Sequence, residues 1–152
     1  RQYEPILYGW KEGAKHFWCG DRDQSDIWNY KKPHVNDLHP TMKPVELVER
    51  AIRNSSRPGN VVLDPFGGSG TTLIAAEKSG RLARLIELDP KYADVIVRRW
   101  QDFTGKQATL EGTGQTFDDV AAGRKAANDN AEAENNKASQ RVVIEDLTGA
   151  SE

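Results

Sequence analysis

The sequence has little of several features that would assign it to a class at once. It holds one cysteine, Cys19, which excludes an internal disulfide framework. No apolar run approaches the roughly 20 residues of a membrane span, and no signal peptide is recognisable. The 21 basic and 23 acidic residues give a net charge of -2, so the chain lacks the positive excess of a basic nucleic-acid-binding domain. We therefore expect an intracellular, cytoplasmic protein with no membrane partner.

Three regions of the 152 residues differ in composition. Residues 1–38 hold three of the four tryptophans and three of the four tyrosines, and runs such as EPILYGW and HFWCG predict short strands. Residues 39–118 form the organised part, in which ATLE is a candidate further strand. Residues 119–152 form a polar tail that has no apolar side chain larger than valine up to Gln140. This tail predicts disorder or at most a marginal helix, with RVVIEDL as a candidate strand near its end.

The organised part alternates helix and strand patterns. Pro44 suits the first position of a helix whose apolar face holds Val45, Val48 and Ile52. Gly80 suits the cap that ends a helix, and Asp89-Pro90 suits the start of one. The expected order is helix 44–54, strand 61–63, helix 69–79, strand 82–88 and a helix from residue 90. This order predicts an α/β fold in which helices flank parallel strands.

The stretch LDPFGGSGTT predicts a glycine turn between a strand and a helix, where a ligand can approach the main chain. A phosphate-binding P-loop needs a lysine after its last glycine, but Thr71 follows Gly70 here. A dinucleotide turn needs a third glycine, and Leu73 stands in its place. Both readings are therefore disfavoured, including that of an NAD-dependent oxidoreductase.

Two carboxylates bracket this turn. Asp64 ends the first strand, and a carboxylate there suits a cationic ligand end better than a phosphate. Glu87 ends the second strand, where an acidic side chain can accept hydrogen bonds from two ribose hydroxyls. A nucleoside that carries an amino acid satisfies both, which points to S-adenosylmethionine. The alternative is a tight turn that Asp64 merely caps.

Three motifs in order, HPTMKP, LDPFGGSGTT and IELDPKY, resemble the DNA methyltransferases that methylate adenine N6 or cytosine N4. The resemblance covers residues 39–103 and fits the subgroup whose catalytic motif lies upstream of the cofactor motif. The aromatic segment before it resembles, more loosely, phage-type members. The resemblance implies a partial Rossmann-like S-adenosylmethionine-dependent methyltransferase fold, double-stranded DNA as the partner of the full-length protein, and a bacterial or phage restriction-modification context.

The resemblance also implies the residues of a cofactor site. Glu87 would hold the ribose hydroxyls, and Thr41 and Lys43 would reach the methionine carboxylate from a second wall. For Lys43 the alternative is a solvated surface lysine. The glycine turn would supply Asp64, Pro65, Phe66, Gly68, Ser69, Gly70, Thr71 and Thr72. No metal site is expected, because the spacing of His16, Cys19, His34 and His39 matches no zinc pattern.

The chain departs from the family in one respect. Catalysis there rests on Asp, Asn or Ser followed by Pro-Pro and an aromatic residue, and the aromatic stacks on the flipped base. None of the seven prolines here is adjacent to another. We therefore expect a C-terminal fragment whose catalytic motif would lie upstream of residue 1, with no catalytic residue in this chain. The alternative is a degenerate, non-catalytic nucleotide-binding or regulatory module of phage origin.

Overall fold

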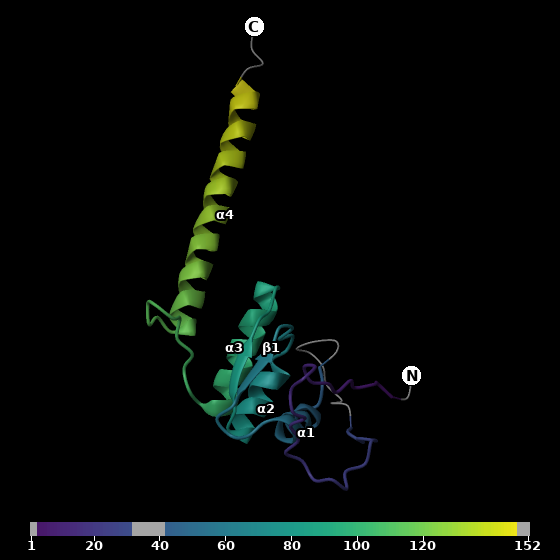
Figure 1. Ribbon diagram of the computed structural model, residues 1–152. Coiled ribbons are helices and arrows are strands. Elements are labelled where there is room, and N and C mark those ends of the chain that lie inside the picture. Colours follow the sequence, from purple (N-terminus) through teal and green to yellow (C-terminus); the bar gives the residue numbers. More distant parts are fainter. Residues whose placement is uncertain (1–2, 32–41, 149–152) are drawn as a thin grey trace. The chain divides into compact units, whose positions relative to one another are not determined.

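The computed structural model describes residues 3–31 and 42–148 (Figure 1). The chain divides into two compact units, Arg1–Gly105 and Lys106–Glu152. Thr41 of the expected cofactor site lies outside the described residues.

The first unit contains the alternating elements that the sequence predicts. Strands β1 and β2 pair in parallel, with Val61 opposite Leu82 and Asp64 opposite Leu85. A hydrogen bond from the Lys91 amide to Asp89 Oδ1, 2.9 Å long, caps the helix that begins at Pro90. The elements are α1 (Val45–Ser55), β1 (Val61–Asp64), α2 (Thr71–Ser79), β2 (Leu82–Leu85) and α3 (Pro90–Thr104). The predicted α/β fold with parallel strands between helices is confirmed.

One face of the two-stranded sheet carries the core. Ile52 of α1 packs with Ala75 and Ala76 of α2, and Val62 and Ala83 reach this cluster from the strands. Helix α1 packs on α2 (Figure 1), and α2 packs on β2. Ala75 is fully buried, so small side chains on α2 let the helix approach its neighbours closely. The first unit therefore has a single thin core on one side of its sheet.

The other face of the sheet is bare among the described residues. Val61, Leu63 and Leu82 alternate with the core-facing positions, and 60%, 66% and 51% of their surfaces are exposed. Parallel sheets are almost always covered on both faces. This face is therefore an unusually apolar surface for a folded unit.

The aromatic segment, residues 3–31, contains no strand, so the strands expected there are absent. Its order comes from side chains instead of a backbone ladder. Tyr8 makes edge contacts with His16 and Trp18, at ring-centroid distances of 5.6 and 5.5 Å, and its hydroxyl donates to the Phe17 carbonyl. The sequence pattern predicted strands here and did not reveal that a partner strand is missing, because alternation of residue types does not say whether a neighbour is available to pair.

The second unit is dominated by α4 (Phe117–Thr148). The Thr116 hydroxyl donates to Asp119 Oδ2, and its oxygen accepts from the Asp119 amide at 3.2 Å, which gives the helix a capping arrangement. The structure thus has a helix where the sequence favours disorder or a marginal helix, and residues of RVVIEDL are helical instead of extended. ATLE forms only an isolated bridge, Thr109 to Thr116. Among the described helices none is apolar enough over a sufficient length to cross a membrane.

Candidate functional site

The glycine turn connects β1 to α2 at the carboxyl end of the strands. The Gly67 amide donates to the Ile86 carbonyl at 2.9 Å, and the Gly70 amide donates to the Gly67 carbonyl at 2.8 Å. Gly70 has a φ of 77°, and a Cβ there would lie 3.0 Å from Ile96 Cγ2 of α3. Only glycine fits this position without strain or a clash. The turn is therefore compact and fixed against α3.

Asp64 holds the turn from its first residue. Its Oδ1 accepts from the Phe66 amide at 3.0 Å, and its Oδ2 accepts from the Thr72 hydroxyl at 2.6 Å. The carboxylate therefore joins the end of β1 to the first turn of α2. This is the capping role that the sequence left open as an alternative, and the side chain remains partly exposed.

Glu87 lies two residues beyond β2 and is tied to the same turn. Its Oε2 accepts from the Gly68 amide at 2.7 Å, and its Oε1 accepts from the Asp89 amide at 3.0 Å. The side chain thus bridges the glycine turn and the start of α3. Asp64 and Glu87 come from adjacent parallel strands at their shared carboxyl edge, which is where open α/β sheets bind ligands.

The segment before α1 meets the turn through its main chain. The Thr71 hydroxyl, at the first position of α2, donates to the Lys43 carbonyl at 3.3 Å. The Lys43 ammonium forms an exposed ion pair with Glu4. The structure therefore brings Lys43 to the glycine turn by its backbone, while its side chain faces Glu4.

Arg99 of α3, which no sequence pattern pointed to, completes the arrangement. One guanidinium nitrogen, Nη1, donates to the Ser69 carbonyl at 3.0 Å, to Ser69 Oγ at 3.3 Å and to Thr71 Oγ1 at 3.2 Å. Burial lowers the pKa of Arg99 below its usual value. The signal that could have revealed it is helical spacing, because Arg99 is three residues beyond Ile96, the side chain that packs on Gly70.

Apolar surface is also presented at the turn. Phe66 is 85% exposed, and Pro65 beside it is exposed. A large aromatic side chain this open at a carboxyl strand edge can cover an apolar ligand surface. The described residues contain no group of three or more His, Cys, Asp and Glu side chains placed to hold a metal.

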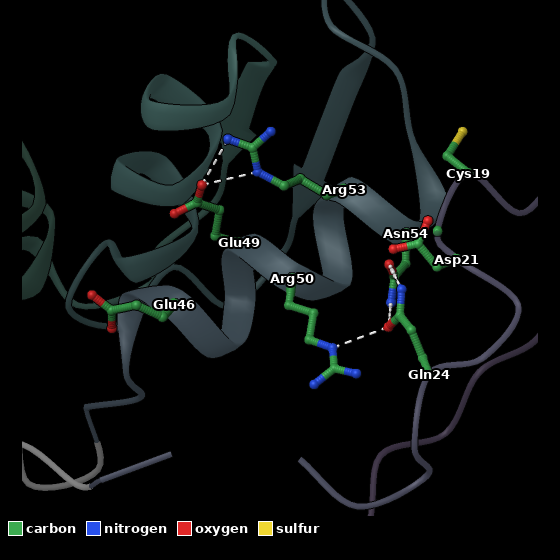
Figure 2. A pocket seen from close by; sticks show the side chains of 9 residues that line it. Cys19, Asp21, Gln24, Glu46, Glu49, Arg50, Arg53 and Asn54 are labelled. Carbon is green, nitrogen blue, oxygen red and sulfur yellow. Dashed lines mark hydrogen bonds and ion pairs between the residues drawn. The ribbon is translucent and has the colours of Figure 1, made fainter. Parts of the chain in front are cut away.

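A separate pocket of ≈ 430 Å³ lies between α1 and residues 19–24 and includes none of the predicted site residues. Figure 2 shows the side chains of Gln24, Asn54 and Arg50 turned toward one another. The Gln24 and Asn54 amides form two reciprocal hydrogen bonds of 2.9 Å, and Arg50 Nε donates to Gln24 Oε1 at 3.0 Å. The Cys19 amide donates to the Asn54 carbonyl at 2.7 Å. These polar groups form hydrogen bonds with one another, and the bonds anchor the aromatic segment to α1.

Sequence comparison with known proteins finds DNA methyltransferases. Type II methyltransferase M.Cfr9I of Citrobacter freundii is 38% identical over 99 residues, which cover 64% of this chain and 33% of the relative. DNA adenine methyltransferase YhdJ of Escherichia coli K12 is 42% identical over 80 residues, which cover 49% of this chain and 26% of the relative. The chain therefore spans about a third or less of the length of these curated relatives.

Comparison with solved structures also finds a methyltransferase. The M1.HpyAVI–SAM complex aligns with a TM-score of 0.52 and 30% identity, covering 59% of this chain and 46% of that protein. The expected fold, that of S-adenosylmethionine-dependent DNA methyltransferases over part of their length, is thus confirmed. The family model described as DNA methylase, for N6 and N4 methylation, matches residues 4–98. A match over more than half of the sequence, with the glycine turn inside it, shows that this chain belongs to the N6/N4 DNA methylase family.

Proposed function

We propose that this chain is the S-adenosylmethionine-binding, C-terminal portion of a DNA methyltransferase that acts on adenine N6 or cytosine N4. We further propose that this methyltransferase belongs to the subgroup whose catalytic motif precedes the cofactor motif, and that it is of phage type. One observation carries it above the others. The Glu87 carboxylate accepts a hydrogen bond from Gly68 at 2.7 Å, so the acidic side chain and the glycine turn form one unit at the strand edge.

The residues of this unit suit the cofactor chemically. The Glu87 carboxylate accepts from two amides at the turn, and a carboxylate is an acceptor-only group of the kind that ribose hydroxyls can donate to. Asp64 supplies negative charge beside the turn for the ammonium group, and the open Phe66 side chain supplies apolar contact. The amide-rich start of α2 favours an anion, which suits the methionine carboxylate. Lys43, and Thr41 outside the described residues, would add to that end of the site.

When bound, the cofactor supplies an electrophilic methyl group on sulfur. The residues of this chain would bind and orient the donor, and exclude water from one side of it. The acceptor groups that hold the target amine belong to the Pro-Pro-aromatic motif of the family, which this sequence lacks. We therefore assign no catalytic residue to the chain, and expect the partner double-stranded DNA to bind the full-length protein.

Titration calorimetry of the folded chain with S-adenosylmethionine and with NAD tests the cofactor assignment. We expect weak binding of S-adenosylmethionine and none of NAD. Glu87→Gln should weaken binding, because an amide loses the charge and half of the acceptor capacity at the turn. Absence of binding to a well-folded sample, or tighter binding of NAD, would contradict the assignment.

A second candidate function is that of a non-catalytic nucleotide-binding or regulatory module. The observation that favours it is that the sequence keeps the cofactor turn and has no Pro-Pro pair. Transfer of tritiated methyl groups to DNA measures whether the chain itself has methyltransferase activity. We expect none from the purified 152-residue chain, and measurable transfer would overturn that expectation. An upstream reading frame encoding the Pro-Pro-aromatic motif would favour the enzyme portion, and its absence would favour the module.

A further inference from the structure

Arg99 links three segments that meet at the start of α2. Its Nη1 donates to the Ser69 carbonyl and hydroxyl and to the Thr71 hydroxyl, at 3.0 to 3.3 Å. The Thr71 hydroxyl in turn donates to the Lys43 carbonyl. A single chain of hydrogen bonds therefore runs from α3, through the glycine turn, to the segment before α1.

The charge of Arg99 is unusual for its position. The first turn of a helix disfavours a cation, because the free amides there carry partial positive charge. Within the described part of the chain, no carboxylate pairs with Arg99. An arginine held only by neutral acceptors at a helix start does not contribute the usual ion-pair stabilisation. Its contacts instead hold Ser69 and Thr71 in place.

We propose that Arg99 is a positioning residue for the half of the site that receives the amino-acid end of S-adenosylmethionine. It acts by fixing the start of α2 against the Lys43 main chain, and it does not itself contact the cofactor. This inference rests on the proposed function. The ribose half, built on Glu87 and Gly68, is held by separate hydrogen bonds and does not depend on Arg99.

This division gives a selective test with two ligands. S-adenosylhomocysteine carries the amino-acid end, whereas 5′-methylthioadenosine lacks it and keeps the ribose and base. Arg99→Met should weaken S-adenosylhomocysteine binding about tenfold, on the scale of a lost charge-assisted hydrogen-bond set. The affinity for 5′-methylthioadenosine should stay within about twofold, because its contacts lie in the other half. A loss of general packing would instead weaken both ligands together.

Two further variants show whether the effect passes through the hydrogen-bond chain. Arg99→Lys keeps a donor near Ser69 and should recover part of the loss, to about threefold weaker than the unmodified chain. Thr71→Val removes the next link. The double variant Arg99→Met with Thr71→Val should be no weaker than the worse single variant, because both changes break one chain of contacts.

Two controls keep the charge and the packing effects apart. Arg98→Met removes the same charge from an exposed neighbour on α3 and should leave both affinities unchanged. Glu77→Ala removes a different contact between α2 and α3, the 3.4 Å hydrogen bond from Trp100 Nε1. It should lower the unfolding temperature without changing the ratio of the two affinities.

The outcomes separate this inference from the function on which it rests. If the unmodified, folded chain binds neither S-adenosylmethionine nor S-adenosylhomocysteine, both the proposed function and the inference fail. If it binds them and Arg99→Met leaves the ratio of the two affinities unchanged, the inference alone is overturned. Circular dichroism shows whether Arg99→Met folds. If it does not fold, the ratio of the two affinities measured for Arg99→Lys decides whether the inference holds.

Discussion

The two faces of the β1–β2 sheet are built from similar residues and have different surroundings. Val62 and Ala83 pack on Ile52, Ala75 and Ala76, while Val61, Leu63 and Leu82 stand exposed on the opposite face. Helices α1 and α2 provide the cover for the first face alone. The difference shows that the strands carry a sequence suited to burial on both sides, whereas the described residues of the unit cover only one side.

This asymmetry supports the proposal that the chain is a portion of a larger fold. Parallel sheets in α/β proteins normally carry helices on both faces. The curated relatives are about three to four times as long as the part they share with this chain. The remaining parts of such a protein would supply the second cover, and the exposed Leu63 would then contribute to a core.

The largest expected effect is on the covered face. Ile52→Ala should lower the free energy of unfolding by about 2–4 kcal/mol, because it removes buried methyl groups from a thin core and leaves a cavity. Urea unfolding followed by circular dichroism measures this. The matched change on the bare face, Leu63→Ala, should alter it by less than about 0.5 kcal/mol, since that side chain is exposed. Equal losses would mean that the bare face is covered in solution.

The next effect concerns the turn beside the sheet. Gly70→Ala should cost about 1–2 kcal/mol for its positive φ, and a further 1–3 kcal/mol, roughly, for the contact with Ile96. Gly59→Ala is the control, because Gly59 has a φ of 82° and nothing within 4 Å of the added Cβ. Thermal unfolding compares the two variants. If Gly59→Ala is as destabilising as Gly70→Ala, the turn does not depend on its packing against α3.

A smaller effect is expected at the anchor of the aromatic segment. Gln24→Ala removes the part-buried hydrogen bonds to Asn54 and Arg50 (Figure 2). It should lower the free energy of unfolding by about 1 kcal/mol. Trp28, whose ring lies 4.4 Å from the Arg50 guanidinium carbon, should shift its fluorescence to longer wavelength.

The sheet should be unaffected by that loss. The far-UV circular dichroism of the Gln24→Ala chain should match that of Asp23→Ala, an exposed neighbour. A cooperative loss of helix and strand signal would show that the covered face depends on the aromatic segment as well as on α1 and α2.

The smallest expected effect on stability comes from the ion pairs of Glu49 with Arg53 and Lys78, at the rim of the covered face. Burial acts to raise the pKa of Glu49, but hydrogen bonds from Lys78 and Arg53 hold it below its usual value of 4.5. A lowered pKa in the folded state stabilises the fold above pH 4.5, and this contribution is lost as the pH falls through the lowered value. Glu49→Gln should cost about 0.2–1 kcal/mol at pH 7.

The pH dependence supplies the check on that prediction. Unfolding free energies of the two proteins, measured from pH 7 down to pH 3, should converge as the carboxylate is protonated. A constant difference across this range would show that Glu49 acts through packing and that its charge contributes nothing.

Local chemistry made much of the fold predictable. Pro90 and Asp89 marked the start of α3, and Gly80, with a φ of 70°, marked the end of α2. The apolar run at Val61 correctly indicated a strand of a parallel sheet. Sequence could not show that one face of the sheet is uncovered by the residues that the structure describes, because the residues that cover a face are defined only by their place in space.

The remaining differences have similar causes. Arg99 was missed because a lysine or arginine on a helix is ordinarily a solvated side chain, and only its approach to Ser69 distinguishes it. The aromatic segment lacks strands because its rings, such as Tyr8 and Trp18, pack on one another without a pairing neighbour. The roles of Asp64 and Glu87 in ligand binding stay predictions, although the structure places both at the turn.

The bridge made by Glu87 has a spectroscopic consequence. The Gly68 and Asp89 amide protons point at the two oxygens of one carboxylate, so both resonances report the electron density on that group. In a heteronuclear correlation spectrum, a ribose that shares those oxygens would move the two signals together and in the same direction. A pair of amides 21 residues apart in the sequence thus becomes a paired reporter of how the nucleoside end of the cofactor is engaged.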